Sequence, residues 1–399
     1  MSSAIETPSR IEPALLDEAP AAIADAIADL SAASAVLGRA LHPRTSANLA
    51  GLVRIMNTYY SNLIEGHDTR PRDIERALAG RFDENEGSRN LQIEAAAHVR
   101  VQAQIDRMAA DGALPEPGSC SFILWLHNDF YRDAPDKLLR IEGAGRSFAM
   151  QPGEWRSRPE HDVQIGRHIP PSSDHVAAFM QHFEARFRFE RLGKAGRIMA
   201  MATAHHRLNY IHPFPDGNGR VSRLMSHAMA HTAGIGAHGL WSVSRGLARG
   251  LESRTEYKVM MSHADLPRQG DRDGRGNLSE RALVDFVLWF LRVCLDQVTF
   301  MTGLFELDAL ARRLRGYVEQ SDRLKPEASR LLEEALFRGE FERGEAARIT
   351  GLPERTARRV LNDVLSEGLL ASETPKGSVS LRFPADTLEV LFPRLYPQT

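Results

Sequence analysis

The stretch that decides the fold is residues 212–220, His212-Pro213-Phe214-Pro215-Asp216-Gly217-Asn218-Gly219-Arg220. Its Gly-Asn-Gly triplet stands directly before residues 221–233, which have the residue pattern of a helix. Glycines let backbone N–H groups approach an anion because no Cβ is in the way. The N-terminus of a helix adds partial positive charge at the same place. The stretch therefore predicts a turn that binds an anion such as phosphate.

The charged side chains around this turn fit phosphate chemistry. Arg220 and Arg223 are three residues apart, so they share one helix face and can grip neighbouring phosphates. Asp216 stands at the mouth of the turn, where a hard divalent cation that bridges two phosphates needs a carboxylate oxygen. His212 lies just upstream and has the unperturbed pKa that suits a general base near neutrality. Phe214, between two prolines, is expected to anchor the loop in the core.

Residues 212–223 as a whole resemble the signature of the Fic (filamentation induced by cAMP) family, with every defining position matched. The resemblance implies a mainly α fold with an all-helical Fic core. It implies ATP as substrate and Mg²⁺ as cofactor, with Mn²⁺ as a substitute. The implied activity is that of a protein adenylyltransferase, which moves AMP from ATP to a Ser, Thr or Tyr hydroxyl of a target protein. A looser match extends over about residues 45–300.

The resemblance also implies roles for single residues. His212 would activate the target hydroxyl, and Asp216 would hold the magnesium ion. Arg223 would meet the γ-phosphate of ATP. Tyr257 follows the motif at a place where a Tyr often lines the nucleobase pocket, although a purely structural aromatic residue fits the sequence equally well. The resemblance also places Phe214 among the ATP-binding positions of the loop. The residues that would bind the α- and β-phosphates are Gly217, Asn218, Gly219 and Arg220.

Residues 45–66 have a helical period, and the end of this helix resembles the inhibitory motif of the same family. Ser61 and Glu65 are four residues apart, so both can point at one site. In the resemblance, Glu65 would compete with the γ-phosphate for Arg223. The alternative is an ordinary helix end, closed by Gly66, with a solvated glutamate.

Residues 143–171 are rich in glycine and proline, and we expect a loop or a small β-hairpin there. Residues 153–171 resemble the flap that precedes the Fic core. The exposed strand edge of a flap can pair with an extended segment of a target protein, which would place the hydroxyl in the site. The alternative is an ordinary surface hairpin.

Residues 321–399 predict a winged helix-turn-helix domain. Helices are expected at 327–338, 343–350 and 354–366, followed by a hairpin at 369–383. The third helix carries three arginines that can meet DNA phosphates, Arg355, Arg358 and Arg359. The domain has 12 Lys and Arg against 13 Asp and Glu, which is no strong electrostatic footprint for nucleic acid. DNA contact and protein contact both stay open.

The remaining composition is that of an ordinary globular protein of 399 residues with a net charge of -2. We expect three regions: 1–110 with the inhibitory helix, 111–320 as the catalytic core, and 321–399. Cys120 and Cys294 have no metal-ligand spacing, so a cytoplasmic location without disulfides is expected. The apolar stretch 282–295 is too short to span a membrane and predicts a buried helix, for which Asn277 is the expected N-cap. His205 and His206 lack a third ligand at a suitable spacing.

Other functions stay open beside protein adenylylation. Within the family, the enzyme could use another donor, such as one that supplies UMP, phosphocholine or phosphate, or it could remove AMP from its targets. Outside enzymes, the chain could be a DNA-binding regulator in which the core senses a nucleotide. The sequence does not choose among target proteins, modified residue types, nucleobases or oligomeric states.

Overall fold

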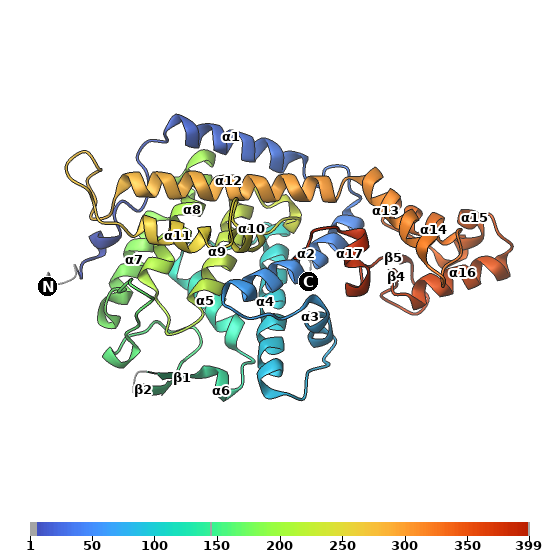
Figure 1. Ribbon diagram of the computed structural model, residues 1–399, viewed down its shortest axis with the longest axis horizontal. Helices are drawn as coiled ribbons and strands as arrows, with labels where there is room; N and C mark the ends of the chain where they lie inside the picture. Colours follow the sequence, from blue (N-terminus) through green and yellow to red (C-terminus); the bar gives the residue numbers. More distant parts are fainter. Residues whose placement is uncertain (1–5, 144–145, 398–399) are drawn as a thin grey trace. The chain divides into compact units, whose positions relative to one another are not determined.

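The computed structural model describes residues 6–143 and 146–397, and these are mainly α-helical (Figure 1). The described chain forms two compact units, neither of which is continuous in sequence. Unit 1 comprises Met1–Ser34, Asn57–Gly236 and Ser242–Gln297. Unit 2 comprises Ala35–Met56, Ala237–Trp241 and Val298–Thr399. This division differs from the three consecutive regions expected from the sequence, because residues 35–56 pack with the C-terminal part of the chain.

The α-helices of unit 1 surround the motif. They are α1 (Ala21–Val36), the end of α2 (Pro43–Ile64), α3 (Pro71–Leu78), α4 (Glu86–Ala110), α5 (Cys120–Tyr131), α6 (Asp136–Leu139), α7 (Val176–Arg186), α8 (Lys194–Ile211), α9 (Asn218–Thr232), α10 (Val243–Arg249), α11 (Glu256–Ala264) and most of α12 (Glu280–Leu304). Helices α8 and α9 pack side by side, and α9 also packs against α4 and α5. Most residues of α8 and α9 are buried. The loop between them, residues 212–217, therefore starts from the centre of the unit.

The predicted flap region contains less strand than a full hairpin. The two regular strands, β1 (Arg140–Gly143) and β2 (Arg146–Ala149), pair antiparallel at its N-terminal edge. From Met150 to Pro171 the chain is irregular, with a short 3₁₀ turn at Pro159–His161. A second, tighter pairing joins Ile165 and His168 around Gly166, whose positive φ of 59° needs a glycine. Residues 144–145 of the predicted flap lie outside the described residues.

Helix α12 confirms the buried helix expected at 282–295 but not its cap. The side chain of Ser279, and not that of Asn277, accepts the hydrogen bond from the N–H of Ala282, at 3.1 Å. Asn277 instead donates to the carbonyl of Ser9. Both residue types are good caps, and the tertiary contact with residue 9 decides between them. No helix in the described residues is long and apolar enough to cross a membrane.

Unit 2 contains the elements expected for the C-terminal domain. Helices α14 (Ala328–Arg338), α15 (Ala346–Thr350) and α16 (Glu354–Ser366) follow α13 (Leu307–Gln320), and α17 (Leu388–Leu391) comes last. The predicted hairpin is present as β4 (Leu370–Ala371) and β5 (Val379–Leu381), and β3 (Glu340–Phe341) pairs with the other edge of β5. The three arginines of α16 are exposed. Their contact with DNA stays a prediction, which a gel-shift assay with a salt titration tests.

Buried histidines predict that acid destabilises this fold. Desolvation lowers the pKa of His98 and of His205 to about 3, and that of His127 to about 4. The unfolded chain, with an ordinary value near 6.5, takes up protons first as the pH falls. The free energy of unfolding should therefore decrease from about pH 7 to about pH 5, as measured by urea denaturation. His98→Gln should reduce this slope, and a stability that is equal at both pH values would contradict the prediction.

Candidate active site

The loop that follows α8 is held in shape by its own side chains. His212 ends the helix in a left-handed conformation, with φ 51° and ψ 62°, which turns the chain out of the helix. The Asn218 amide both accepts from the N–H of Phe214, at 2.9 Å, and donates to its carbonyl, at 2.8 Å. The buried ring of Phe214 stacks on His127 with a centroid distance of 3.9 Å and an interplanar angle of 6°. Phe214 is thus the core anchor that the sequence predicts, and the side chain of Asn218 is used within the loop.

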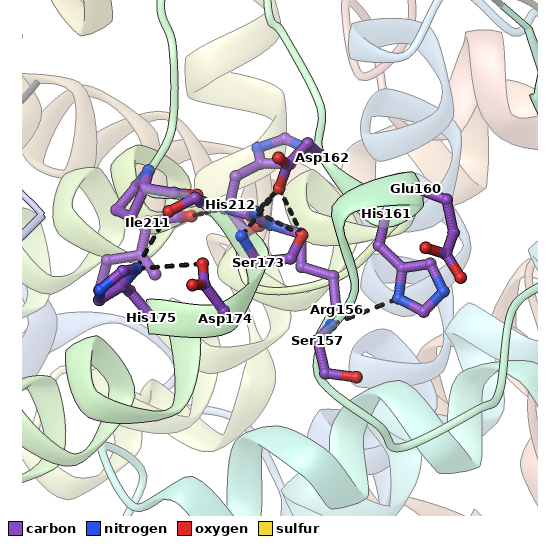
Figure 2. A network of polar contacts seen from close by, with 12 residues as sticks. Arg156, Ser157, Glu160, His161, Asp162, Ser173, Asp174, His175, Ile211 and His212 are labelled. Atoms are coloured by element: carbon purple, nitrogen blue, oxygen red, sulfur yellow. Dashed lines mark hydrogen bonds and ion pairs between the residues drawn. The ribbon is translucent and has the colours of Figure 1, made fainter. Parts of the chain in front are cut away.

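A buried arginine, Arg156, holds the backbone behind His212 (Figure 2). Its Nε donates to the carbonyl of His212 at 2.7 Å, and one terminal nitrogen donates to the carbonyl of Ile211 at 3.1 Å. The other terminal nitrogen donates to Ser173 Oγ at 3.0 Å and lies 3.4 Å from Asp162. The segment expected to be a flap therefore also supports the loop from behind. No sequence pattern marks Arg156 for this position.

His212 itself is neutral near pH 7. Desolvation, reinforced by the positive charge of Arg156, lowers the pKa of His212 to about 4. The residue nevertheless keeps part of its surface exposed. An unprotonated imidazole that solvent or a ligand can reach is able to accept a proton.

Asp216 is ionised and its side chain is 53% exposed. Desolvation acts to raise the pKa of Asp216, but the charge of Arg220 and hydrogen bonds from Gly217 N–H and Tyr131 OH outweigh it and lower the pKa. The Tyr131 hydroxyl donates to Asp216 Oδ2 at 2.9 Å. An exposed, charged carboxylate oxygen is the kind of ligand that Mg²⁺ prefers.

Arg220 and Arg223 leave α9 toward different helices. The guanidinium of Arg220 forms a two-pronged pair with Glu94 of α4, at 3.0 and 3.1 Å, and also donates to Tyr131 OH at 3.0 Å. Desolvation opposes the charge of Arg220, but the nearby Tyr131, Glu94 and Asp216 raise its pKa. Glu94 itself is buried, and desolvation raises its pKa. The two arginines therefore have different partners instead of a common one, and Arg220 is engaged by a carboxylate, Glu94, that the sequence did not single out.

The buried Arg223 is clamped by the end of α2. Its Nε donates to Ser61 Oγ at 2.9 Å, and a terminal nitrogen donates to Ser61 O at 3.2 Å and to Glu65 Oε1 at 2.6 Å. Desolvation acts to raise the pKa of Glu65, whereas the charge and hydrogen bond of Arg223 lower it, and the net shift is downward. Ser61 and Glu65 thus point at one site, as their four-residue spacing predicts, and that site is Arg223, as the resemblance implies.

The Glu65 carboxylate also covers the anion-binding turn. A Cβ added to Gly219 would lie 2.4 Å from Glu65 Oε1 and 3.0 Å from an Arg223 nitrogen. Gly217, the N-cap of α9, has a positive φ of 81°, and a Cβ there would lie 2.8 Å from the ring of Tyr131. Both glycines are therefore required by close approach. The carboxylate that rests on this turn is an internal anion at a helix N-terminus.

Tyr257 lies beside Arg223 and is almost completely buried. Its hydroxyl hydrogen-bonds to His205 Nε2 at 2.8 Å, and its ring stacks on Trp289. Desolvation raises the pKa of Tyr257 to about 12. These contacts describe a packed aromatic residue in the wall of the site, and a nucleobase contact stays a prediction.

His205 and His206 do not converge on a metal position. His205 bonds to Ser226 and Tyr257, whereas His206 bonds to the carbonyl of Met261 and faces Asp265. The residues that sequence reasoning missed are those that support the loop from other helices and from the 150–171 segment, namely Glu94, His127, Tyr131 and Arg156.

Comparison with known proteins agrees with this geometry. Residues 118–230, which run from the start of α5 through most of α9, match the family described as Fic/DOC. Residues 118–230 therefore form a Fic domain. The chain is 39% identical over 90 residues to proteins named "Protein adenylyltransferase Fic" from Drosophila erecta and Drosophila melanogaster. The match covers 23% of this chain and 18% of each relative, so the chain spans less than a fifth of the length of these relatives.

Two solved structures show the same fold. A Fic family protein from Desulfovibrio desulfuricans is 17% identical, with a TM-score of 0.51 over 91% of this chain and 97% of that chain. A Fic domain-containing signaling protein from Bacteroides thetaiotaomicron is 20% identical, with a TM-score of 0.50 over 71% of this chain and 97% of that chain. The mainly α Fic fold expected from the motif is therefore confirmed.

The contacts of Arg156 predict that its replacement lowers the free energy of unfolding of the protein. Arg156→Met keeps the length of the side chain but leaves buried carbonyls, including that of His212, without donors. The free energy of unfolding should fall by about 2 kcal/mol or more, since one unsatisfied buried group costs about 1–3 kcal/mol. Arg158→Met is the matched control, because that side chain is 70% exposed and pairs only loosely with Glu160. Equal urea-denaturation curves for the two variants would contradict the supporting role of Arg156.

Proposed function

We propose that the chain is a protein adenylyltransferase that transfers AMP from ATP to a hydroxyl of a target protein and is inhibited by its own Glu65. The observation that carries this proposal is the common site formed by a neutral His212, an ionised Asp216 and the N-terminal turn of α9. The names of the partial relatives support the same activity.

The residues around the turn fit a magnesium-bound triphosphate. Asp216 would hold Mg²⁺, which would neutralise phosphate charge and polarise the oxygens of the phosphates. The backbone N–H groups at Gly217, Asn218 and Gly219 are available to phosphate oxygens in the way that helix N-termini bind anions. Arg223 would pair with the γ-phosphate after Glu65 leaves it.

His212 would act as the general base in the transfer. The imidazole takes the proton of the target hydroxyl as that oxygen bonds to the α-phosphorus of ATP. The bond from the α-phosphorus to the bridging oxygen breaks, and pyrophosphate leaves with the electron pair. AMP remains on the target oxygen. Arg156 contributes by fixing the backbone at His212, so it is a positioning residue.

Charge supports the inhibitory role of Glu65. Three carboxylates, Glu65, Glu94 and Asp216, face two guanidiniums, Arg220 and Arg223, so the group holds one more negative than positive side chain. A triphosphate that enters this group is repelled, and Glu65 occupies both the turn and the fork of Arg223. A carboxylate and a phosphate cannot share that fork, since like charges so close exclude each other.

Target docking is proposed at the flap segment. Ile165 and Ile169 are large exposed hydrophobic residues on either side of the tight turn at Gly166. They lie on a short paired segment that an extended peptide can join by strand addition. A site of this kind selects an accessible hydroxyl in an extended chain, and Ser, Thr and Tyr all meet that requirement.

The activity predicts a strict need for His212, best measured where inhibition is absent. In a Glu65→Gly background, His212→Ala should reduce protein labelling from radiolabelled ATP by about 10²–10⁴-fold, because the general base is lost. ATP binding, measured by calorimetry, should change little since the turn and the arginines remain. Labelling at the rate of the Glu65→Gly parent would remove His212 from the role of base.

Inhibition predicts that Glu65→Gly activates the enzyme. Labelling of the chain itself and of lysate proteins should rise by about 10²-fold or more, because the γ-phosphate is no longer displaced and the α-phosphate is aligned for attack. Glu65→Gln is the matched control, since it keeps most of the bulk without the charge and should give an intermediate rise. ADP binding should change much less than ATP binding.

A further substitution tests the pairing itself. Arg223→Ala in the Glu65→Gly background should cancel much of the gain, because the released γ-phosphate has lost its partner. Activity that is unchanged or lower in Glu65→Gly, with His212-dependent labelling still present, would refute the inhibition while leaving the transferase activity intact. In that case, Glu65 would become a candidate group for removing AMP from targets.

A further inference from the structure

A second cluster of titratable side chains lies on α9, one turn beyond Arg223. His227 follows Arg223 by four residues and His231 follows by four more, so all three lie along one face of the helix. On α4, Asp106 stands twelve residues after Glu94 on the corresponding face. The proposed transfer reaction uses none of the three residues Asp106, His227 and His231.

The three side chains converge on one point. Asp106 Oδ1 lies 2.6 Å from His227 Nε2 and 3.0 Å from His231 Nε2. The two Nε2 atoms are 3.3 Å apart. Each side chain is 10% exposed or less. Two imidazole nitrogens and one carboxylate oxygen are therefore enclosed in a space the size of a metal coordination sphere.

These distances fit a tetrahedral transition-metal site. Zn²⁺ binds His nitrogen and carboxylate oxygen at about 2.0–2.2 Å, so its ligand atoms stand about 3.3 Å apart in a tetrahedron. The two nitrogens are already at that separation, and the carboxylate needs only a small outward shift. Imidazole nitrogen suits Zn²⁺ and its neighbours in the first transition row, whereas Mg²⁺ prefers oxygen.

Gly236 leaves the space that the ring of His231 occupies. A Cβ at residue 236 would lie 2.1 Å from His231 Nδ1, so only glycine allows this position of the ring. In this position, Nε2 of His231 points toward Asp106 and His227. A preoriented ligand set loses less entropy when a metal binds.

We propose that Asp106, His227 and His231 form a binding site for one Zn²⁺ ion that cross-links α4 to α9. The fourth ligand would be a water molecule. The ion would hold the helix that carries Arg220 and Arg223 at a fixed distance from the helix that carries Glu94. This site is separate from the proposed Mg²⁺ position at Asp216, both in its ligands and in its donor chemistry.

The test is a metal titration of the untagged full-length chain after removal of metal with a chelator. Calorimetry with Zn²⁺ alone should give one site per chain, and Zn²⁺ should raise the melting temperature. Co²⁺ at the same site should give the intense visible absorption of a four-coordinate ion. Asp106→Asn and His231→Gln should each weaken Zn²⁺ binding by about 100-fold or more, since loss of even a residue that only orients a metal ligand costs about 10–100-fold.

His263→Gln is the matched control, because His263 is exposed and pairs with Asp285 on another part of the surface. It should bind Zn²⁺ like the parent. Asp106→Asn keeps the size of the side chain, and a cooperative melt in chelator shows that each variant folds. Absence of a stoichiometric site in the parent, or parental Zn²⁺ affinity in both Asp106→Asn and His231→Gln, would overturn the proposal. Neither readout depends on adenylyl transfer.

Discussion

The buried guanidinium of Arg223 requires an anion, and the geometry of the site follows from that requirement. A buried charge without a partner costs several kcal/mol, so this position is stable only when an acceptor set surrounds it. In the structure, the set is Ser61 and Glu65 from the end of α2. The same requirement can be met by a phosphate. The need of Arg223 for an anion therefore holds the end of α2 on α9, and under the proposed function a nucleotide phosphate would replace Glu65 in this contact.

Four further contacts of the site helices are polar and directional. Four residues of α4, each four apart, form one stripe: Glu94, His98, Gln102 and Asp106. The outer two meet α9 at Arg220 and at the His227–His231 pair, and the inner two hydrogen-bond to Thr58 and Asn57 of α2. Apolar packing tolerates small rotations of a helix, whereas hydrogen bonds and ion pairs do not. This stripe fixes the orientation of α9, and with it the turn at its N-terminus.

The sequence could predict contacts between residues that are close along the chain, but few contacts between residues that are far apart in sequence. The anion-binding turn before α9, and the pair Ser61 and Glu65, follow from local spacing. Glu94, Tyr131 and Arg156 could not be found in this way, because each meets its partner across 126, 85 or 56 residues. Nothing in the Gly- and Pro-rich segment around Arg156 indicates that this side chain is buried and donates a hydrogen bond to a distant carbonyl. The prediction that Asn277 is the N-cap of α12 was wrong for the same reason, since the side chain of Asn277 is occupied by a contact with residue 9.

The position of Glu65 at the end of α2 makes its pairing easy to exchange. The helix closes with the N–H of His67 bonded to the carbonyl of Asn62, at 2.9 Å, and with Gly66 in a left-handed conformation. A carboxylate at a helix C-terminus is disfavoured by the partial negative charge there. The side chain of Glu65 is also 33% exposed, so it can leave Arg223 without first being released from the core. Its place is therefore maintained by Arg223 and by the positive end of α9, the same two groups that a triphosphate would seek. In the proposed function, inhibition by Glu65 and nucleotide binding would therefore compete for one set of contacts, and a stronger anion would shift the balance between them.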